Sequence, residues 1–228
     1  LAEARRWIGT PYHHQASCLG AGCDCLGLVR GSRSTRLAPV LQPGNTIQLT
    51  WRARLEDQLG QFVVELLTAR AAELVNDRTR LYLSQLVCGH LRLLPERDPH
   101  DRLLGLALRL IDSPPDGVAL VQFELAVLDE LGFGLDLGQC AVTGTTEDLT
   151  HVSPRSGRAV SRAAAAPYLD RLLPLPSFLT TRGNASPHDI ADALHLTSHF
   201  LQSRVFGPRD LALSATRDAL VTALTQEH

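Results

Sequence analysis

A strongly apolar helix followed by a short hairpin constrains the fold more than any other stretch of this chain. Residues 118–131 place hydrophobic side chains on almost every side of a predicted helix, and such a helix is usually buried on most sides. Gly132 and Gly134 end it, because glycine takes the left-handed cap conformation without steric cost. After Cys140, the sequences DLTHVS, PRSG and RAVS predict a small hairpin within residues 146–161.

The rest of the chain predicts strands first and helices afterwards. Residues 45–54 and 61–70 are rich in β-branched and aromatic side chains, which favours two strands. Residues 71–94 predict a helix, and further helices follow from residue 98, from Ser186 and near the C terminus. The short Pro-rich turns between the central helices are typical of an antiparallel bundle.

Local signals mark two helix termini. Ser186 predicts an N-cap, and Asp189 three residues later completes a capping-box arrangement. At the start of the chain, residues 2–8 predict a short helix that Gly9 and Pro11 would end.

Positive charge gathers in one segment. The net charge is −2 and all 22 basic residues are arginines, which argues against a globally basic nucleic-acid binder but not against a local patch. Residues 26–55 contain five arginines and no Asp or Glu. A β-surface with this bias suits binding of a nucleic-acid backbone, because arginine displaces counterions from phosphate. The alternative is a solvated strand face with ordinary surface arginines. The candidate DNA-binding residues are Arg30, Arg33, Arg36, Arg52 and Arg54.

The five cysteines do not suggest a disulfide framework, because their number is odd and their spacing uneven. No segment reaches the roughly 18 apolar residues of a membrane span, and no signal peptide is recognisable. We therefore expect a protein of the reducing cytoplasm, associated with the nucleoid if it binds DNA, with no membrane partner.

The sequence GCDCLGLV places Cys25 just before an apolar run. Residues 1–25 resemble the start of NlpC-type cysteine peptidases, which cut cell-wall peptides. The resemblance implies that Cys25 is a nucleophile at a helix start, where the helix dipole favours the thiolate, and that Tyr12 belongs to the entrance motif. Such enzymes also need a base histidine on a downstream strand, whereas the later histidines here fall in helical or loop settings. The alternative is an inert thiol.

Cys140 raises the question of a zinc site. A structural zinc site needs four Cys or His ligands, commonly two CxxC pairs. Thr143 occupies the second CxxC position and no second pair follows, which leaves His151 as the only other nearby ligand. We expect no metal at this hairpin.

A second potential ligand set lies in the helix that follows Ser186. His188, Asp192, His195 and His199 are spaced by four, three and four residues, which puts them on one helical face. The alternative is the solvent face of the helix, with local Asp–His pairs. The chain contains no HExxH, no Walker A and no GxSxG motif. From residue 26 onward the sequence shows no reaction chemistry, so we expect neither an enzyme nor a cofactor.

From about residue 27 to 220 the chain resembles the RecO family of bacterial recombination mediators. The segments that carry the resemblance are LGLVRG, PVLQPGNTIQLTWRARLEDQLG, LRLLPERDPH, FELAVLDELGFGLDLGQCAVTGTTEDLTHVSPRSGRAVSR, RLLPLPSFL and HFLQSRVFGPRDL. The resemblance implies an α+β, mostly α fold. Residues 26–70 would form an incomplete OB-like barrel and residues 71–228 a helical bundle domain, with hairpin 146–161 as a degenerate zinc module. Residues 1–25 are an atypical N-terminal segment.

The resemblance also implies a function. RecO-like proteins bind single- and double-stranded DNA, anneal complementary strands, and bind the C-terminal tail of single-strand-binding protein. With RecR they help to load RecA during recombinational repair. A complete barrel would begin with two further strands before LGLVRG, so we expect DNA binding to be weaker here than in an intact family member.

Overall fold

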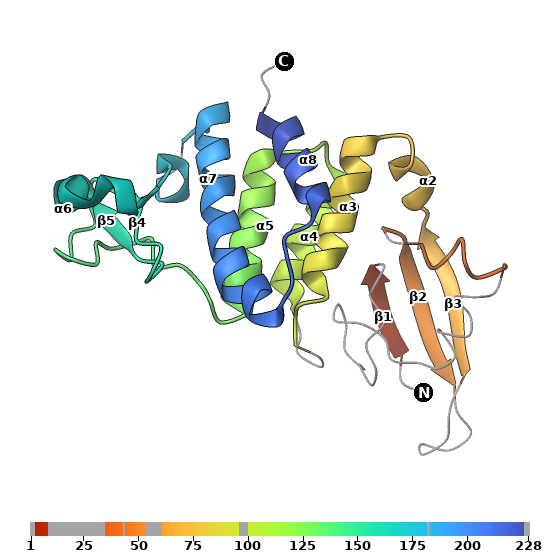
Figure 1. Cartoon of the computed structure of the whole chain (residues 1–228). Helices are drawn as coiled ribbons and strands as arrows, with labels where there is room; N and C mark the ends of the chain where they lie inside the picture. Colours follow the sequence, from red (N-terminus) through yellow and green to blue (C-terminus); the bar gives the residue numbers. More distant parts are fainter. Residues whose placement is uncertain are drawn as a thin grey trace. The chain divides into compact units, whose positions relative to one another are not determined.

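The computed structural model describes residues 3–8, 35–42, 44–52, 61–95, 100–181 and 183–225 (Figure 1). The chain divides into two compact units, Leu1–Pro115 and Asp116–His228, which are described one after the other. Within these residues the structure is a mostly helical α+β fold with two small three-stranded sheets, in agreement with the predicted class. The predicted domain limits at residues 25 and 70 stay predictions. No helix in the described part of the chain is long and apolar enough to cross a membrane.

The first unit contains an antiparallel sheet of order β1-β2-β3. Its strands are β1 (Glu3–Ile8), β2 (Thr46–Arg52) and β3 (Gln61–Thr68). Strands β2 and β3 confirm the two predicted strands. Strand β1 corrects the short helix predicted over residues 2–8. Isolated helices this short are marginal in water, whereas pairing with β2 gives the backbone of β1 its hydrogen-bond partners.

Three helices follow in the first unit: α2 (Ala71–Leu74), α3 (Arg78–Leu91) and α4 (Asp101–Asp112). The prediction of one continuous helix over residues 71–94 is therefore wrong, because two helices occupy this segment. Asp77 breaks it by taking an extended backbone (φ −126°, ψ 106°), from which its side chain accepts hydrogen bonds from Thr79 N and Arg80 N. The buried apolar residues of α3 and α4 are Leu83, Leu86, Val87, Cys88, Leu91, Leu103, Ala107, Leu110 and Ile111.

The second unit is built on α5 (Gly117–Glu130), α7 (Pro187–Phe200) and α8 (Ala215–Thr225). Helix α5 confirms the predicted apolar helix, and most of its side chains are buried. The capping box at Ser186 is confirmed, since its hydroxyl accepts from Asp189 N while the Asp189 carboxylate accepts from Ser186 N. The α-helical part of this segment stops at Phe200, and the chain continues as a π-helical turn, η3 (Leu201–Phe206).

A small β module lies between α5 and α7 in the sequence. Its sheet has the order β5-β4-β6, formed by β4 (Leu149–Val152), β5 (Ala159–Ser161) and β6 (Leu173–Pro174). Strands β4 and β5 confirm the predicted hairpin. Helix α6 (Arg162–Ala165) and the 3₁₀ turn η1 (Ala166–Arg171) complete the module, whose core is Cys140, Val160 and Ala165. We call residues 132–175 the hairpin module.

A buried ion pair joins the helices of the second unit. Glu124 in α5 is fully buried, and so is almost all of Arg217 in α8. Arg217 Nε donates to Glu124 Oε1 at 2.7 Å and Arg217 Nη2 to Glu124 Oε2 at 2.8 Å. Burial lowers the pKa of Arg217, but hydrogen bonds to Glu124 and its negative charge raise it more, so the net shift is upward. Arg217 is therefore charged in the folded protein.

The same network reaches helix α7. Arg217 also donates to Ser198 Oγ, to Thr197 Oγ1 and to the Leu194 carbonyl. Thr197 Oγ1 in turn donates to Glu124 Oε2. Because every charged atom of the pair has a partner, the desolvation penalty of burying it is offset.

Replacing Arg217 with Met should destabilise the protein by about 3–5 kcal/mol, because Glu124 would remain buried without a compensating charge. Urea unfolding followed by circular dichroism measures the loss. The matched control replaces both partners, Glu124→Leu with Arg217→Met, and should recover at least half of the lost stability. A single variant as stable as the wild type would show that the pair is not a structural constraint.

Candidate nucleic-acid interface

The structure places two of the five candidate arginines. Arg36 is exposed near the start of the turn formed by residues 35–41. Arg52 is the last residue of β2, and the structure describes its backbone position only. Arg30, Arg33 and Arg54 lie outside the described residues.

Asn45 holds the arginine-bearing turn against the rest of the first unit. Its buried side chain donates to the carbonyls of Pro39 at 3.0 Å and Val40 at 3.1 Å. Its side-chain oxygen accepts from Ala71 N at 2.9 Å, at the start of α2. One amide therefore joins the turn that carries Arg36, the entry to β2 and the first helix of the unit.

Arg70 makes a second link between the sheet and the helices. Its guanidinium donates to Thr46 Oγ1 at the first residue of β2. It also forms a two-pronged ion pair with Asp112, the last residue of α4, with Nη2 2.9 Å from Oδ2. Such bidentate pairs fix geometry as well as contributing energy. The start of β2 is therefore held from two sides, and the turn next to it has little freedom to move.

Arg36 lies in the turn that precedes β2, and Arg52 is the last residue of that strand. The turn with Arg36 is fixed near Thr46, and Arg52 lies six residues further along the strand. At about 3.3 Å per residue, the backbone of Arg52 is roughly 20 Å from the start of the strand. This length is several times the spacing of about 3.4 Å between successive phosphates of one DNA strand.

The hairpin module was the other site of interest, because Cys140 occupies a potential zinc-ligand position. Ser161 N donates to Cys140 Sγ at 3.3 Å. Burial raises the pKa of the Cys140 thiol, but hydrogen bonds from Ser161 and Thr143 lower it more, to about 6. The thiolate is thus stabilised by N–H and O–H donors. Burial and the nearby charge of Arg162 lower the pKa of His151.

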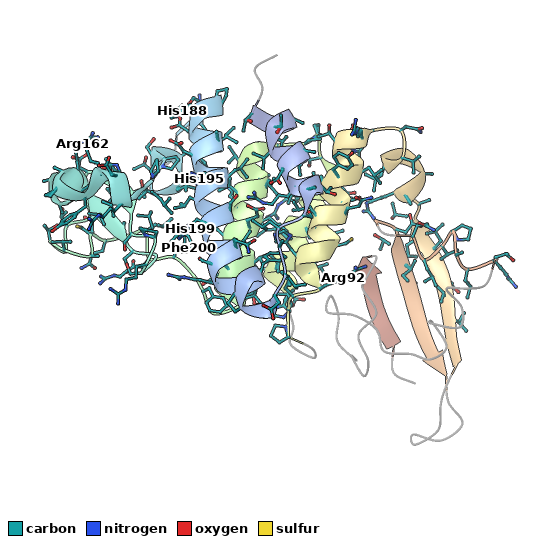
Figure 2. All side chains as sticks on the ribbon, in the orientation of Figure 1. Arg92, Arg162, His188, His195, His199 and Phe200 are labelled. Carbon is teal, nitrogen blue, oxygen red and sulfur yellow. The ribbon has the colours of Figure 1, made fainter. Side chains whose placement is uncertain are left out.

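The histidine series lies along one side of α7, as Figure 2 shows for His188, His195 and His199. His188 Nδ1 is 3.4 Å from Asp192 Oδ2, and His199 Nε2 is 3.3 Å from the Pro154 carbonyl oxygen. In the part of the chain that the structure describes, no three His, Cys, Asp or Glu side chains are grouped so that they could hold a metal ion. Within the series, His188 contacts Asp192 on the same helix, whereas His199 contacts the hairpin module.

Sequence reasoning missed the residues that position the site. The sequence predicts only a strand for Asn45, and its one local signal for an internal hydrogen-bond role is a polar residue between a Pro-Gly turn and that strand. Arg70 was assigned to the end of a strand. Its partner Asp112 is 42 residues away, so no local pattern could pair them.

The comparison with family models decides the relationship of the chain. The model described as "Recombination protein O C terminal" matches residues 75–211, which is more than half of the chain. The chain belongs to the RecO family. The matched span includes α3, α4, α5, the hairpin module and α7.

Individual RecO relatives extend the match to most of the chain. The DNA repair protein RecO of Chelativorans sp. (strain BNC1) is 50% identical over 229 residues, covering 95% of this chain and 92% of the relative. That of Rhizobium etli (strain CIAT 652) is 52% identical over 204 residues, covering 87% and 80%. That of Mesorhizobium japonicum is 48% identical over 233 residues, covering 97% and 92%.

The alignments with RecO relatives test the resemblance of residues 1–25 to the start of a cysteine peptidase. Because one alignment covers 97% of the chain, most of residues 1–25 lie within the span aligned to a RecO protein. The comparisons thus lend no support to the resemblance of this segment to the start of a peptidase. Cys25, the nucleophile of that hypothesis, lies outside the described residues.

Asn45→Ala should destabilise the first unit by about 1–3 kcal/mol, because three backbone groups lose a buried hydrogen-bond partner. Hydrogen exchange at the amides of Val40 and Leu41, read beside urea unfolding, measures the effect. The matched control is Gln42→Ala, which removes one exposed hydrogen bond to the Ala38 carbonyl and should be neutral within about 0.5 kcal/mol. Equal effects of the two variants would contradict the role given to Asn45.

The Cys140 thiolate should make stability depend on pH. Its pKa is about 6 in the folded protein and about 8.5 in an unfolded chain. Its contribution is therefore complete above about pH 8.5, declines as the pH falls, and is lost below about pH 6. The Tm difference between the wild type and Cys140→Ala should shrink over this range. Other titrating groups cancel in the difference, so a difference that does not change with pH would refute the assigned thiolate.

Proposed function

We propose that this protein is a RecO-type DNA repair mediator that binds single- and double-stranded DNA and promotes annealing of complementary strands. The observation that carries the proposal is identity of about 50% to proteins named DNA repair protein RecO over most of both chains. Its partners in this role are RecR and the C-terminal tail of single-strand-binding protein, and its outcome is loading of RecA onto DNA in the cytoplasm. The role consists of binding and positioning DNA.

The arginines of residues 26–55 supply the binding chemistry. Each guanidinium that neutralises a phosphate releases condensed counterions, which drives association without regard to base sequence. Annealing needs this effect in particular, because two strands repel each other until their phosphates are screened. Arg36, fixed through its turn by Asn45, and Arg52 at the end of β2 are the placed members of this set.

In this proposal, the sheet of the first unit forms part of an OB-like barrel, and the barrel carries these arginines. Three antiparallel strands with a bulge in each pairing are consistent with a curved sheet. An OB barrel typically binds about 4–16 nucleotides, a length that accommodates a strand of roughly 20 Å such as β2.

The hairpin module is the metal-free counterpart of a zinc module. The environment of Cys140 supports this assignment. In a zinc module the cysteine sulfur would bind the metal ion, whereas here the Cys140 sulfur accepts a hydrogen bond from Ser161 N. Thr143, at the second position of the CxxC spacing, stabilises the same thiolate. Packing of Cys140 against Val160 and Ala165 closes the small core.

Replacing Arg36 and Arg52 together with Ala should lower the salt dependence of single-stranded DNA binding. The slope of log K against log salt should fall by about 1.4, since each phosphate contact to a single strand contributes about 0.7. Fluorescence anisotropy of a labelled oligo(dT) across a salt series measures the slope. Arg109→Ala, an exposed arginine of α4, is the control for charge alone and should leave the slope unchanged. Absence of any binding by the wild type at low salt would refute the proposed function.

A further inference from the structure

The tip of the β4–β5 hairpin, residues 153–158, brings arginines from two parts of the second unit together. Its sequence, SPRSGR, contributes Arg155 and Arg158, and Arg204 of η3 lies against it. The guanidinium of Arg204 is close enough to Gly157 that a Cβ there would come within 3.1 Å of Nη2 and 3.2 Å of Nη1. Three guanidinium-bearing residues therefore meet within one turn of the hairpin.

The tip is held in a fixed conformation by α7 and η3. Arg204 Nη2 donates to the Arg155 carbonyl at 3.3 Å, and His199 Nε2 lies 3.3 Å from the Pro154 carbonyl oxygen. Gly157 takes a left-handed backbone conformation (φ +74°) beneath Arg204, which other residues adopt only at a cost. A surface that is already ordered loses little conformational entropy when it binds a partner.

A contact with an aromatic ring also holds Arg204 in place. Its guanidinium carbon lies 4.7 Å from the centroid of the Phe200 ring, which is fully buried. Figure 2 shows Phe200 near the end of α7. A guanidinium over an aromatic ring is attracted to the face of that ring, and the Arg155 carbonyl accepts from one of its N–H donors. The remaining donors are available to a ligand.

Negative charge at the tip is small. Within the described part of the chain, Asp136 is the acidic side chain that pairs with these arginines, through Arg158 Nε at 3.2 Å. Both members of that pair are about half exposed, so the interaction is of the weak surface kind and a phosphate could replace the carboxylate. The Ser156 hydroxyl accepts from Arg158 N, which leaves its O–H free to donate.

We propose that the hairpin tip is a second site for the phosphate backbone of a nucleic acid, at which Arg155, Arg158 and Arg204 hold the strand. The proposal rests on the proposed DNA-binding function and extends it to the second unit. Arginine forks and a hydroxyl donor suit phosphate oxygens. An acidic peptide fits less well, because none of the exposed large hydrophobic residues of the described chain falls within residues 153–158 to anchor peptide side chains.

Two sites on one chain have a consequence for annealing. One strand bound in the first unit and another at the hairpin tip are kept at a high effective concentration relative to each other. The protein would then bring complementary strands together, in addition to screening their charge.

The test compares two double variants of the full-length protein that remove the same charge. Arg155→Ala with Arg158→Ala should reduce the salt slope of oligo(dT) binding by about 1.4. Arg162→Ala with Arg171→Ala is the control. These two arginines are exposed in the same module, and Arg162 has a surface ion pair with Asp148 like that of Arg158 with Asp136. Arg204 is left intact because it also braces the tip, and the Tm of both variants verifies folding.

A third variant tests the direction of the effect. Asp136→Asn removes the competing carboxylate from Arg158, so it should tighten oligo(dT) binding and steepen the salt slope. Weaker binding by this variant, at unchanged Tm, would contradict the proposal.

The outcomes separate this inference from the proposed function. If the wild type binds no DNA, both fail. If Arg36→Ala with Arg52→Ala lowers the slope while the Arg155/Arg158 variant does not, only the second site is refuted. An equal loss in the Arg162/Arg171 control would also refute it, since the effect would then be one of net charge. A labelled Asp-rich peptide is the last probe. Loss of its binding in the Arg155/Arg158 variant, with DNA binding intact, would assign the tip to an acidic peptide instead.

Discussion

The second unit depends on one buried ion pair. Glu124 lies in the middle of α5, the most deeply buried helix of the unit, and that helix can be covered on this side only because Arg217 neutralises the carboxylate. The same arginine bonds the Leu194 carbonyl and the Ser198 hydroxyl of α7. It thereby fixes the helix whose continuation carries Arg204. The position of Arg204, a half-buried arginine beside the hairpin tip, thus depends on a charge buried in the helical core.

The first unit uses the same physical device with different residues. A buried amide, Asn45, and a two-pronged guanidinium, Arg70, hold the turn that presents Arg36. In both units, side chains with several hydrogen-bonding atoms are placed where separate segments of the chain meet. Such residues contribute less to net stability than to a single defined arrangement, because a wrong arrangement would leave their buried polar atoms without partners. The same contacts therefore fix the segments that carry the exposed arginines.

Much of this structure could be predicted from local sequence, and what could not was long-range. The capping box at Ser186 and the hairpin around PRSG depend on neighbouring residues, so their patterns were sufficient. The segment at residues 2–8 was mispredicted because its strand exists only through pairing with β2, about 40 residues later. The Glu124–Arg217 pair spans 93 residues. Its one local signal was a charged residue on an otherwise apolar helix, a position that requires a buried partner. The DNA-contacting arginines stay a prediction. Composition marks an arginine-rich segment, but it indicates neither the turn that carries Arg36 nor the π-helical η3 nor the side chains that hold them.

Strand annealing is the measurement that tests the central claim most directly. Two complementary oligonucleotides, one carrying a fluorophore and the other a quencher, report the rate of duplex formation with and without the protein. If exposed arginines held by the buried networks bind DNA backbone, the protein accelerates annealing at low salt and the acceleration disappears as salt rises, because counterion release is lost. An annealing rate that the protein leaves unchanged at every salt concentration, with the protein folded, would contradict the account.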